Sequence, residues 1–222
     1  MSAAHAPERI IARTESEAQT IALGTAIADV VVAGDVVAID GELGAGKTRL
    51  VRGIAMGFGV SAGEVRSPTF ALAHEYTVGP GRPRLVHVDA YRLGGGEDLE
   101  SIGWDRLAGP DSVVVVEWAG RIAEALPPGR IRVRIDHAGE HLRDIVIDMP
   151  PGRAARAVRG FAASLPAAPR IHHCRTCGAE IATELESFPF CSERCRLADL
   201  GNWLSERYRI SRPVDQRDLD EG

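Results

Sequence analysis

Short apolar runs predict the strands of a mainly parallel sheet. Residues 36–40 (VVAID) and 113–116 (VVVV) are continuous apolar runs, typical of strands that are buried on both faces. Residues 70–78 and 85–89 alternate apolar and polar positions on either side of a Gly-Pro-Gly turn, which predicts an antiparallel excursion. Residues 9–13 are expected to form a first strand.

Between these strands, apolar positions recur at helical spacing and predict helices. A period near 3.6 over residues 14–30 predicts a helix, begun by a capping box at Thr14 with Glu17 or at Ser16 with Gln19. An amphipathic helix is expected over residues 48–58, a short helix over residues 121–126 and a closing helix over residues 154–165. Two alternating runs, residues 131–135 and 142–147, predict a hairpin at the edge of the sheet.

The strand of residues 36–40 leads directly into a segment that fits the pattern G-x-x-x-x-G-K-[ST]. We call it the phosphate loop, and its residues are Gly41, Glu42, Leu43, Gly44, Ala45, Gly46, Lys47 and Thr48. Glycines let successive N–H groups point inward, and the following helix adds its positive N-terminal end. The loop is therefore expected to bind a polyphosphate, with Lys47 at the outer phosphates and the Thr48 hydroxyl on Mg²⁺. Lys47 is the only lysine of the chain.

Two acidic residues stand at the ends of apolar strands. Asp89 ends the run 85–89, and Glu117 directly follows the run 113–116. Ligands of an open parallel sheet bind beyond the carboxyl ends of its strands, where Mg²⁺ or an attacking water needs a carboxylate. Either acid alone is most often an ordinary strand-end residue, but the phosphate loop favours a role for both. His87 and His74 alternate with apolar neighbours and are interpreted as structural histidines.

Charge and hydropathy argue against a strongly basic nucleic-acid-binding protein, a membrane protein and a secreted protein. The net charge is −5, so no overall basic field drives nucleic-acid binding, and any RNA or DNA contact is expected to be local or through a partner. The chain has no apolar run of about 18 residues and no charged-then-apolar leader, so we expect neither a membrane span nor a secretory signal. The expected location is the cytoplasm. An apolar content of 45% suffices for a substantial core.

All four cysteines lie in a short C-terminal stretch. They form two closely spaced pairs, Cys174 with Cys177 and Cys191 with Cys195. In a cytoplasmic chain this spacing indicates a tetrahedral Zn²⁺ site rather than disulfides, with four free or redox-active thiols as the alternative. A module of about forty residues has too small a core to fold alone, so the metal would supply much of its folding free energy.

Five ordered motifs between about residues 10 and 150 resemble the bacterial TsaE (YjeE) family. They are GELGAGKT at 41–48, SPTF at 67–70, HVDAYRL at 87–93, ESIGW at 100–104 and VVVVEW at 113–118. That family is the small P-loop ATPase of tRNA threonylcarbamoyladenosine synthesis, and it works with the TsaB and TsaD proteins and, through their complex, with tRNA. The resemblance implies that the loop binds ATP, that Glu117 is on the Mg²⁺ side and that Asp89 is needed for hydrolysis. It also implies that Thr69 acts as a switch threonine near the outer phosphate and that Trp118 borders the site.

The cysteine-containing stretch is similar to another family. The cysteine spacing and the Asp-Leu-Gly-x-Trp signature at 199–203 resemble the YacG family of small zinc proteins that inhibit DNA gyrase, over about residues 171–212. This resemblance implies binding to DNA gyrase, through its gyrase B protein, by a module without enzyme chemistry.

The expected fold is therefore α/β, a P-loop NTPase-like, mostly parallel sheet flanked by helices, with a small C-terminal zinc module. We expect an ATPase domain at residues 1–165, a linker at 166–170, a Cys₄ zinc module at 171–210 and a disordered acidic tail at 211–222. The expected function is an ATPase that drives turnover of the tRNA-modifying complex. Two alternatives remain at this point: a nucleotide-dependent small-molecule kinase and an ATP-gated, non-enzymatic gyrase regulator.

Overall fold

The computed structural model describes residues 7–150, 155–166, 172–174, 176–181 and 190–204. The chain divides into two compact units, Met1–Ala168 and Pro169–Gly222. The expected linker residues 167–170 and the expected acidic tail of residues 211–222 lie outside the described residues. Within the described ranges, no helix has the length and apolar character that a membrane span requires.

The first unit is built on a seven-stranded sheet of order β1-β7-β6-β2-β5-β4-β3. Its strands are β1 (Glu8–Thr14), β2 (Val36–Asp40), β3 (Ala73–Tyr76), β4 (Arg84–Asp89), β5 (Ser112–Glu117), β6 (Ile131–His137) and β7 (Arg143–Met149). The four strands β6, β2, β5 and β4 run parallel, whereas β1 with β7, β7 with β6, and β3 with β4 pair antiparallel. The expected α/β class and the antiparallel excursion are thus confirmed.

The β6–β7 hairpin lies inside the sheet, so its expected position at the edge is wrong. Strand β6 runs parallel to β2, and β1 covers the outer side of β7. Strand β1 buries Ile10 and Ala12 in the core, and Arg9 and Arg13 on its other face pair with Asp148 and Asp144 of β7. Local alternation predicted both strands but carries no information on a pairing between residues so far apart in sequence.

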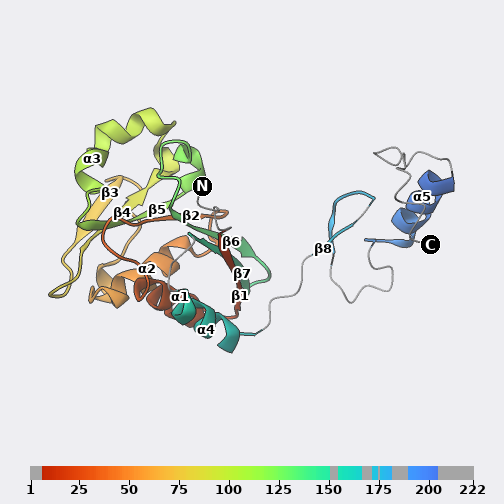
Figure 1. Cartoon of the computed structure of the whole chain (residues 1–222), viewed down its shortest axis with the longest axis horizontal. Helices are drawn as coiled ribbons and strands as arrows, with labels where there is room; N and C mark the ends of the chain where they lie inside the picture. Colours follow the sequence, from red (N-terminus) through yellow and green to blue (C-terminus); the bar gives the residue numbers. More distant parts are fainter. Residues whose placement is uncertain (1–6, 151–154, 167–171, 175, 182–189, 205–222) are drawn as a thin grey trace, which may run out of the picture. The chain divides into compact units, whose positions relative to one another are not determined.

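Three helices cover one face of the sheet, as Figure 1 shows. They are α1 (Glu17–Ala28), α2 (Lys47–Gly57) and α4 (Arg156–Ser164). Ser16 caps α1 and accepts a hydrogen bond from the Gln19 N–H at 3.2 Å, which selects the second of the two predicted capping boxes. The apolar side chains of these three helices pack against alternate residues of the central strands and form the larger core.

The other face of β2, β5 and β4 packs against the connection that contains α3 (Trp104–Leu107). The helix expected over residues 121–126 is wrong: a short 3₁₀ helix spans Ala119–Ile122, and turns follow it. Pro127 and Pro128 come directly afterwards, and the α conformation is disfavoured for the residue before a proline, so the last residues of the expected helix do not continue the 3₁₀ helix.

Helices α1 and α2 cross in close contact because glycines face each other. A Cβ at Gly53 would lie 1.9 Å from the Ile21 carbonyl oxygen, and one at Gly24 would lie 2.3 Å from the Leu50 carbonyl oxygen. The Thr25 hydroxyl also donates to the Gly53 carbonyl at 3.2 Å. This contact fixes α2, whose first residue is Lys47, and therefore fixes the end of the phosphate loop.

The second unit contains the short strands β8 (His172–His173) and β9 (Glu180–Ile181), which pair antiparallel, and helix α5 (Glu193–Leu204). The helix begins two residues before Cys195 and therefore contains that cysteine.

Candidate functional site

The phosphate loop connects the end of β2 to the start of α2. Gly41, Gly44 and Gly46 have φ angles of 152°, 77° and 104°, a region that side chains with a Cβ disfavour. Gly41 also approaches β6 so closely that a Cβ there would lie 2.4 Å from the Ile135 carbonyl oxygen. The glycines of the motif are therefore required by backbone geometry as well as by the ligand expected there.

Lys47 is buried at the start of α2 and bends back over the loop. Its Nζ donates to the Gly41 carbonyl at 2.7 Å and to the Glu42 carbonyl at 2.8 Å. Burial lowers the pKa of Lys47, and the nearby Glu117 and Asp89 carboxylates act in the opposite direction. The ammonium is thus held by neutral carbonyls that a phosphate oxygen can replace.

Trp118 lies directly above this ammonium. It follows β5 in a left-handed conformation with φ of 58°, and the Lys47 Nζ is 3.5 Å from the centre of its ring. A cation over an aromatic face is attracted electrostatically. A left-handed tryptophan costs conformational energy, which the surrounding structure must offset, and such positions concentrate at binding sites.

Glu117, at the end of β5, binds the hydroxyl of the phosphate loop. The Thr48 Oγ1 lies 2.8 Å from Oε1 and 3.0 Å from Oε2 of Glu117, and the carboxylate is buried. A hydroxyl and a carboxylate are hard oxygen donors of the kind that Mg²⁺ prefers. The two residues that the sequence assigned to Mg²⁺ therefore lie together.

Asp89, at the end of β4, has a different set of partners. Its Oδ2 accepts from the Ser67 hydroxyl at 2.5 Å and from the Thr69 hydroxyl at 2.8 Å, and its Oδ1 accepts from the Tyr91 N–H at 3.0 Å. The carboxylate is buried and held by three donors. The segment before β3 thus contributes two hydroxyls to the strand-end acid, and Ser67 was not among the expected site residues.

His87 connects the site to the core of the sheet. Its side chain is fully buried, with Nε2 2.9 Å from Glu117 Oε1 and Nδ1 3.2 Å from the Tyr76 hydroxyl. Burial, and secondarily the charge of Glu117, raises the pKa of Tyr76 to about 12. Sequence reasoning treated His87 as structural and missed that it holds an acid of the site. The available signal was that His87, Asp89 and Glu117 share one side of neighbouring strands.

The side chains of Lys47, Thr48, Asp89, Glu117 and Trp118 line a single cavity of about 490 Å³. Its walls come from the phosphate loop and α2, the segment before β3, and the ends of β4 and β5; the lining residues are Leu43, Gly44, Gly46, Lys47, Thr48, Arg49, Ser67, Thr69, Asp89, Tyr91, Glu117 and Trp118. Gly41, Glu42 and Ala45, the other members of the motif, lie outside this lining. An ammonium, several hydroxyls and two carboxylates around one cavity suit an Mg²⁺-bound polyphosphate.

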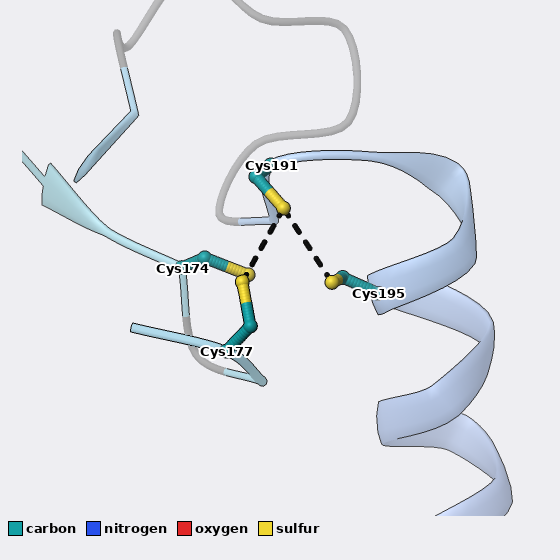
Figure 2. A group of neighbouring side chains, drawn as sticks. All are labelled: Cys174, Cys177, Cys191 and Cys195. Carbon is teal, nitrogen blue, oxygen red and sulfur yellow. Dashed lines mark hydrogen bonds between the residues drawn. The ribbon is translucent and has the colours of Figure 1, made fainter. Parts of the chain in front are cut away.

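The four cysteines of the second unit converge in space (Figure 2). All four sulfur atoms lie within 4.8 Å of one another, and none is in a disulfide. Cys191 Sγ is 3.5 Å from Cys177 Sγ and 3.4 Å from Cys195 Sγ. Zn–S bonds of about 2.3 Å in a tetrahedron separate the sulfurs by about 3.8 Å, so the cluster fits Zn²⁺. Gly178, with φ of 73°, makes the turn after the first pair.

Comparison with known proteins gives a family match for each unit. Residues 14–145 match the family described as threonylcarbamoyl adenosine biosynthesis protein TsaE, and residues 172–221 match DNA gyrase inhibitor YacG. Both matches confirm the resemblances seen in the sequence.

Individual relatives support the first match. A Streptomyces coelicolor protein named tRNA threonylcarbamoyladenosine biosynthesis protein TsaE is 50% identical over 118 residues, which cover 52% of this chain and 78% of that protein. The protein of the same name from Bacillus subtilis is 38% identical over 133 residues, covering 60% and 81%. The crystal structure of Bacillus subtilis YdiB is similar with a TM-score of 0.55 and 30% identity, covering 72% of this chain and 98% of that one.

Proposed function

The chain belongs to the TsaE family of threonylcarbamoyl adenosine biosynthesis proteins, and from this membership and the geometry of the phosphate loop we propose that it is an Mg²⁺-dependent ATPase. The observation that carries the proposal is the hydrogen bond between Thr48 and Glu117 at the wall of the cavity. It joins the last residue of the phosphate loop to a strand-end acid 69 residues later, and in P-loop enzymes the metal is held by a loop hydroxyl and a strand-end acid of this kind.

Each residue of the cavity has a role in this proposal. The Lys47 ammonium leaves the Gly41 and Glu42 carbonyls and neutralises charge on the outer phosphates. Thr48 and Glu117 would hold Mg²⁺ through their oxygen atoms, and the bound ion would neutralise charge on the phosphates. Trp118 limits the space above the ammonium.

Asp89 is the residue that orients the attacking water. Its carboxylate accepts a hydrogen bond from the water and directs the lone pair toward the outer phosphorus, and the products are ADP and phosphate. Ser67 and Thr69 hold that carboxylate from the side of the segment before β3. Thr69 therefore acts as a positioning group, and its hydroxyl is also near enough to the cavity to respond to the outer phosphate.

We further propose that hydrolysis drives repeated turnover of a tRNA-modifying complex with TsaB and TsaD, in the cytoplasm, where tRNA is modified. Reconstitution tests this: threonylcarbamoyladenosine formed per mole of the partner proteins is measured with and without this chain. The proposal requires several turnovers with the wild-type chain and about one with Lys47→Ala. Equal yields with both chains would contradict it.

For the second unit, we propose a structural Zn²⁺ held by the four cysteines and a docking function toward the gyrase B protein of DNA gyrase. The match of residues 172–221 to the gyrase-inhibitor family supports this proposal. Supercoiling by gyrase is assayed with the full chain and with its Cys177→Ser variant. Inhibition by the former alone is expected, and no inhibition by either would refute gyrase as the partner.

A further inference from the structure

Arg143 contacts the outside of the phosphate loop. It begins strand β7 and is buried, with 9% of its surface exposed. Its Nε donates to the Ala45 carbonyl at 2.9 Å, and Nη2 donates to the Gly44 carbonyl at 3.4 Å. It does not line the cavity of the expected phosphates but a second hollow beside the loop, together with Ala45 and Gly46.

The same guanidinium also fixes the turn that precedes β7. Its Nη1 donates to the carbonyls of Leu142 at 2.7 Å, Gly139 at 3.1 Å and Glu140 at 3.3 Å. In the described part of the chain its hydrogen-bond partners are thus main-chain carbonyls. Such a buried cation needs several good acceptors, because burying an unpaired charge is costly.

The loop carbonyls are divided between two cations. Lys47 binds the carbonyls of Gly41 and Glu42 from the cavity side, and Arg143 binds those of Gly44 and Ala45 from outside. His137 Nε2 lies 3.3 Å from the carbonyl between them, that of Leu43. If Lys47 turns to a phosphate, the first two carbonyls lose their donor, whereas Arg143 does not line the cavity and can keep its contacts.

The contacts that Arg143 makes from outside with the loop carbonyls also set the direction of N–H groups of the same peptides. In a trans peptide the C=O and N–H groups point in opposite directions. The peptide that joins Ala45 to Gly46 has its carbonyl held by Arg143, so its N–H is directed away from Arg143, and Gly46 is one of the residues that line the cavity. N–H groups aimed inward are what binds phosphate in such a loop.

We propose that Arg143 is a positioning residue for the phosphate loop: it holds the carbonyls of Gly44 and Ala45 so that the cradle keeps its shape with and without nucleotide. The inference rests on the proposed function, since it concerns the affinity of the same cavity for a nucleotide. A planar fork of five donors is needed to reach the loop and the turn together, which a lysine cannot do.

The test compares the full chain with Arg143→Gln, Arg143→Lys and Arg13→Gln. Arg13 is a matched control, because it lies on the neighbouring strand and pairs with Asp144 at 2.7 Å without contact to the loop. Binding of Mg²⁺·ADP is measured by isothermal titration calorimetry, and amide hydrogen exchange of residues 41–48 is measured without ligand. Melting temperature reports on folding in each variant.

We expect Arg143→Gln to weaken Mg²⁺·ADP binding about tenfold or more, the loss typical of hydrogen bonds from a charged group. Arg143→Lys should lose less affinity for Mg²⁺·ADP than Arg143→Gln. Arg13→Gln should bind Mg²⁺·ADP with an affinity within about twofold of that of the wild type. Loop amides should exchange faster in Arg143→Gln but not in Arg13→Gln. If Arg143→Gln fails to fold, Arg143→Lys decides by the same two readouts.

Equal affinity and equal exchange in the wild type and the Arg143 variants would overturn the inference, and so would equal losses in Arg143→Gln and Arg13→Gln. If the wild type itself binds no nucleotide, the proposed function fails. Hydrogen exchange of the unliganded loop still tests Arg143 in that case.

Discussion

Asp89 and Glu117 occupy paired positions at the carboxyl ends of the neighbouring parallel strands β4 and β5. Their surroundings differ: Glu117 binds Thr48 and His87, whereas Asp89 binds Ser67 and Thr69. One acid is thus connected to the phosphate loop and the other to the segment before β3. This difference supports assigning Mg²⁺ to Glu117 and the attacking water to Asp89.

The two acids should therefore respond differently to loss of charge. Glu117→Gln should raise the Mg²⁺ concentration needed for half-maximal activity, because a metal ligand loses its charge. Asp89→Asn should bind ATP normally and hydrolyse it about a hundredfold more slowly or worse. Titration of Mg²⁺ in an ATPase assay, together with calorimetric ATP binding, measures both effects.

Asp40→Asn is the matched control for these variants. Asp40 also ends a parallel strand, but its Oδ1 accepts from the Gly120 N–H at 2.7 Å and it does not line the cavity. It should leave the Mg²⁺ requirement unchanged. The reverse pattern for Glu117 and Asp89 would exchange their roles.

His87 should matter for both stability and metal affinity. His87→Leu leaves the Glu117 carboxylate and the Tyr76 hydroxyl without this partner in a buried place, which costs about 1–3 kcal/mol of unfolding free energy. His87→Gln retains an amide donor for Glu117 and should recover part of the Mg²⁺ affinity that His87→Leu loses. Urea unfolding and Mg²⁺ titration of the two variants check this. Unchanged Mg²⁺ affinity in His87→Leu would leave His87 as a purely structural residue.

The ion pair across β1 and β7 should make stability depend on pH. The hydrogen bond from Arg9, and then its charge, lowers the pKa of Asp148 below its ordinary value. A carboxyl with a lowered folded-state pKa stabilises the fold above its unfolded pKa of about 4, and that stability is lost as pH falls through the folded pKa.

Asp148→Asn should accordingly cost up to about 1 kcal/mol at pH 7, a small value because Arg9 is exposed. The difference from the wild type should shrink as the pH falls below about 4 and Asp148 becomes protonated through its lowered pKa. Urea unfolding over a series of pH values from 7 downward gives the comparison. A difference that persists unchanged in acid would show that Asp148 acts through packing instead of charge.

The zinc module should be separable from the ATPase. A chain that ends after Leu165 should keep its ATPase rate and lose one bound Zn²⁺ per chain, because the four cysteines lie in the second unit. Cys177→Ser should unfold the small unit alone, since three thiolates close the metal site poorly. Metal analysis and ATPase assays decide this. Zinc retained by the truncated chain, or activity lost while it remains folded, would refute the separation.

Contiguous signals made the first unit readable from its sequence. The phosphate loop is one unbroken segment, and buried apolar runs marked the strands whose ends hold Asp89 and Glu117. The parallel arrangement then required both acids to lie at one edge of the sheet. The converging cysteines were likewise predictable, because their spacing alone indicates a metal site.

Contacts between distant residues could not be predicted in the same way. The Arg143 side chain and its Ala45 partner are 98 positions apart, and an arginine in an alternating strand is usually a solvated residue. Strand β1 pairs with β7, which is far from it in the sequence, so the β6–β7 hairpin lies inside the sheet rather than at its edge. Register and side-chain partners of this kind are set by tertiary packing.

The most direct test of the ATPase assignment is release of inorganic phosphate from Mg²⁺·ATP by the purified chain, with Lys47→Ala and Thr48→Ala as controls. Each substitution removes a group that stabilises charge on the outer phosphate or its metal, which commonly costs about 3–4 kcal/mol, a hundredfold or more in rate. We predict Mg²⁺-dependent phosphate release by the wild type, alone or with TsaB and TsaD, and its near loss in both variants. Equal release by all three chains, or transfer of the phosphate to an added acceptor in place of water, would contradict the assignment.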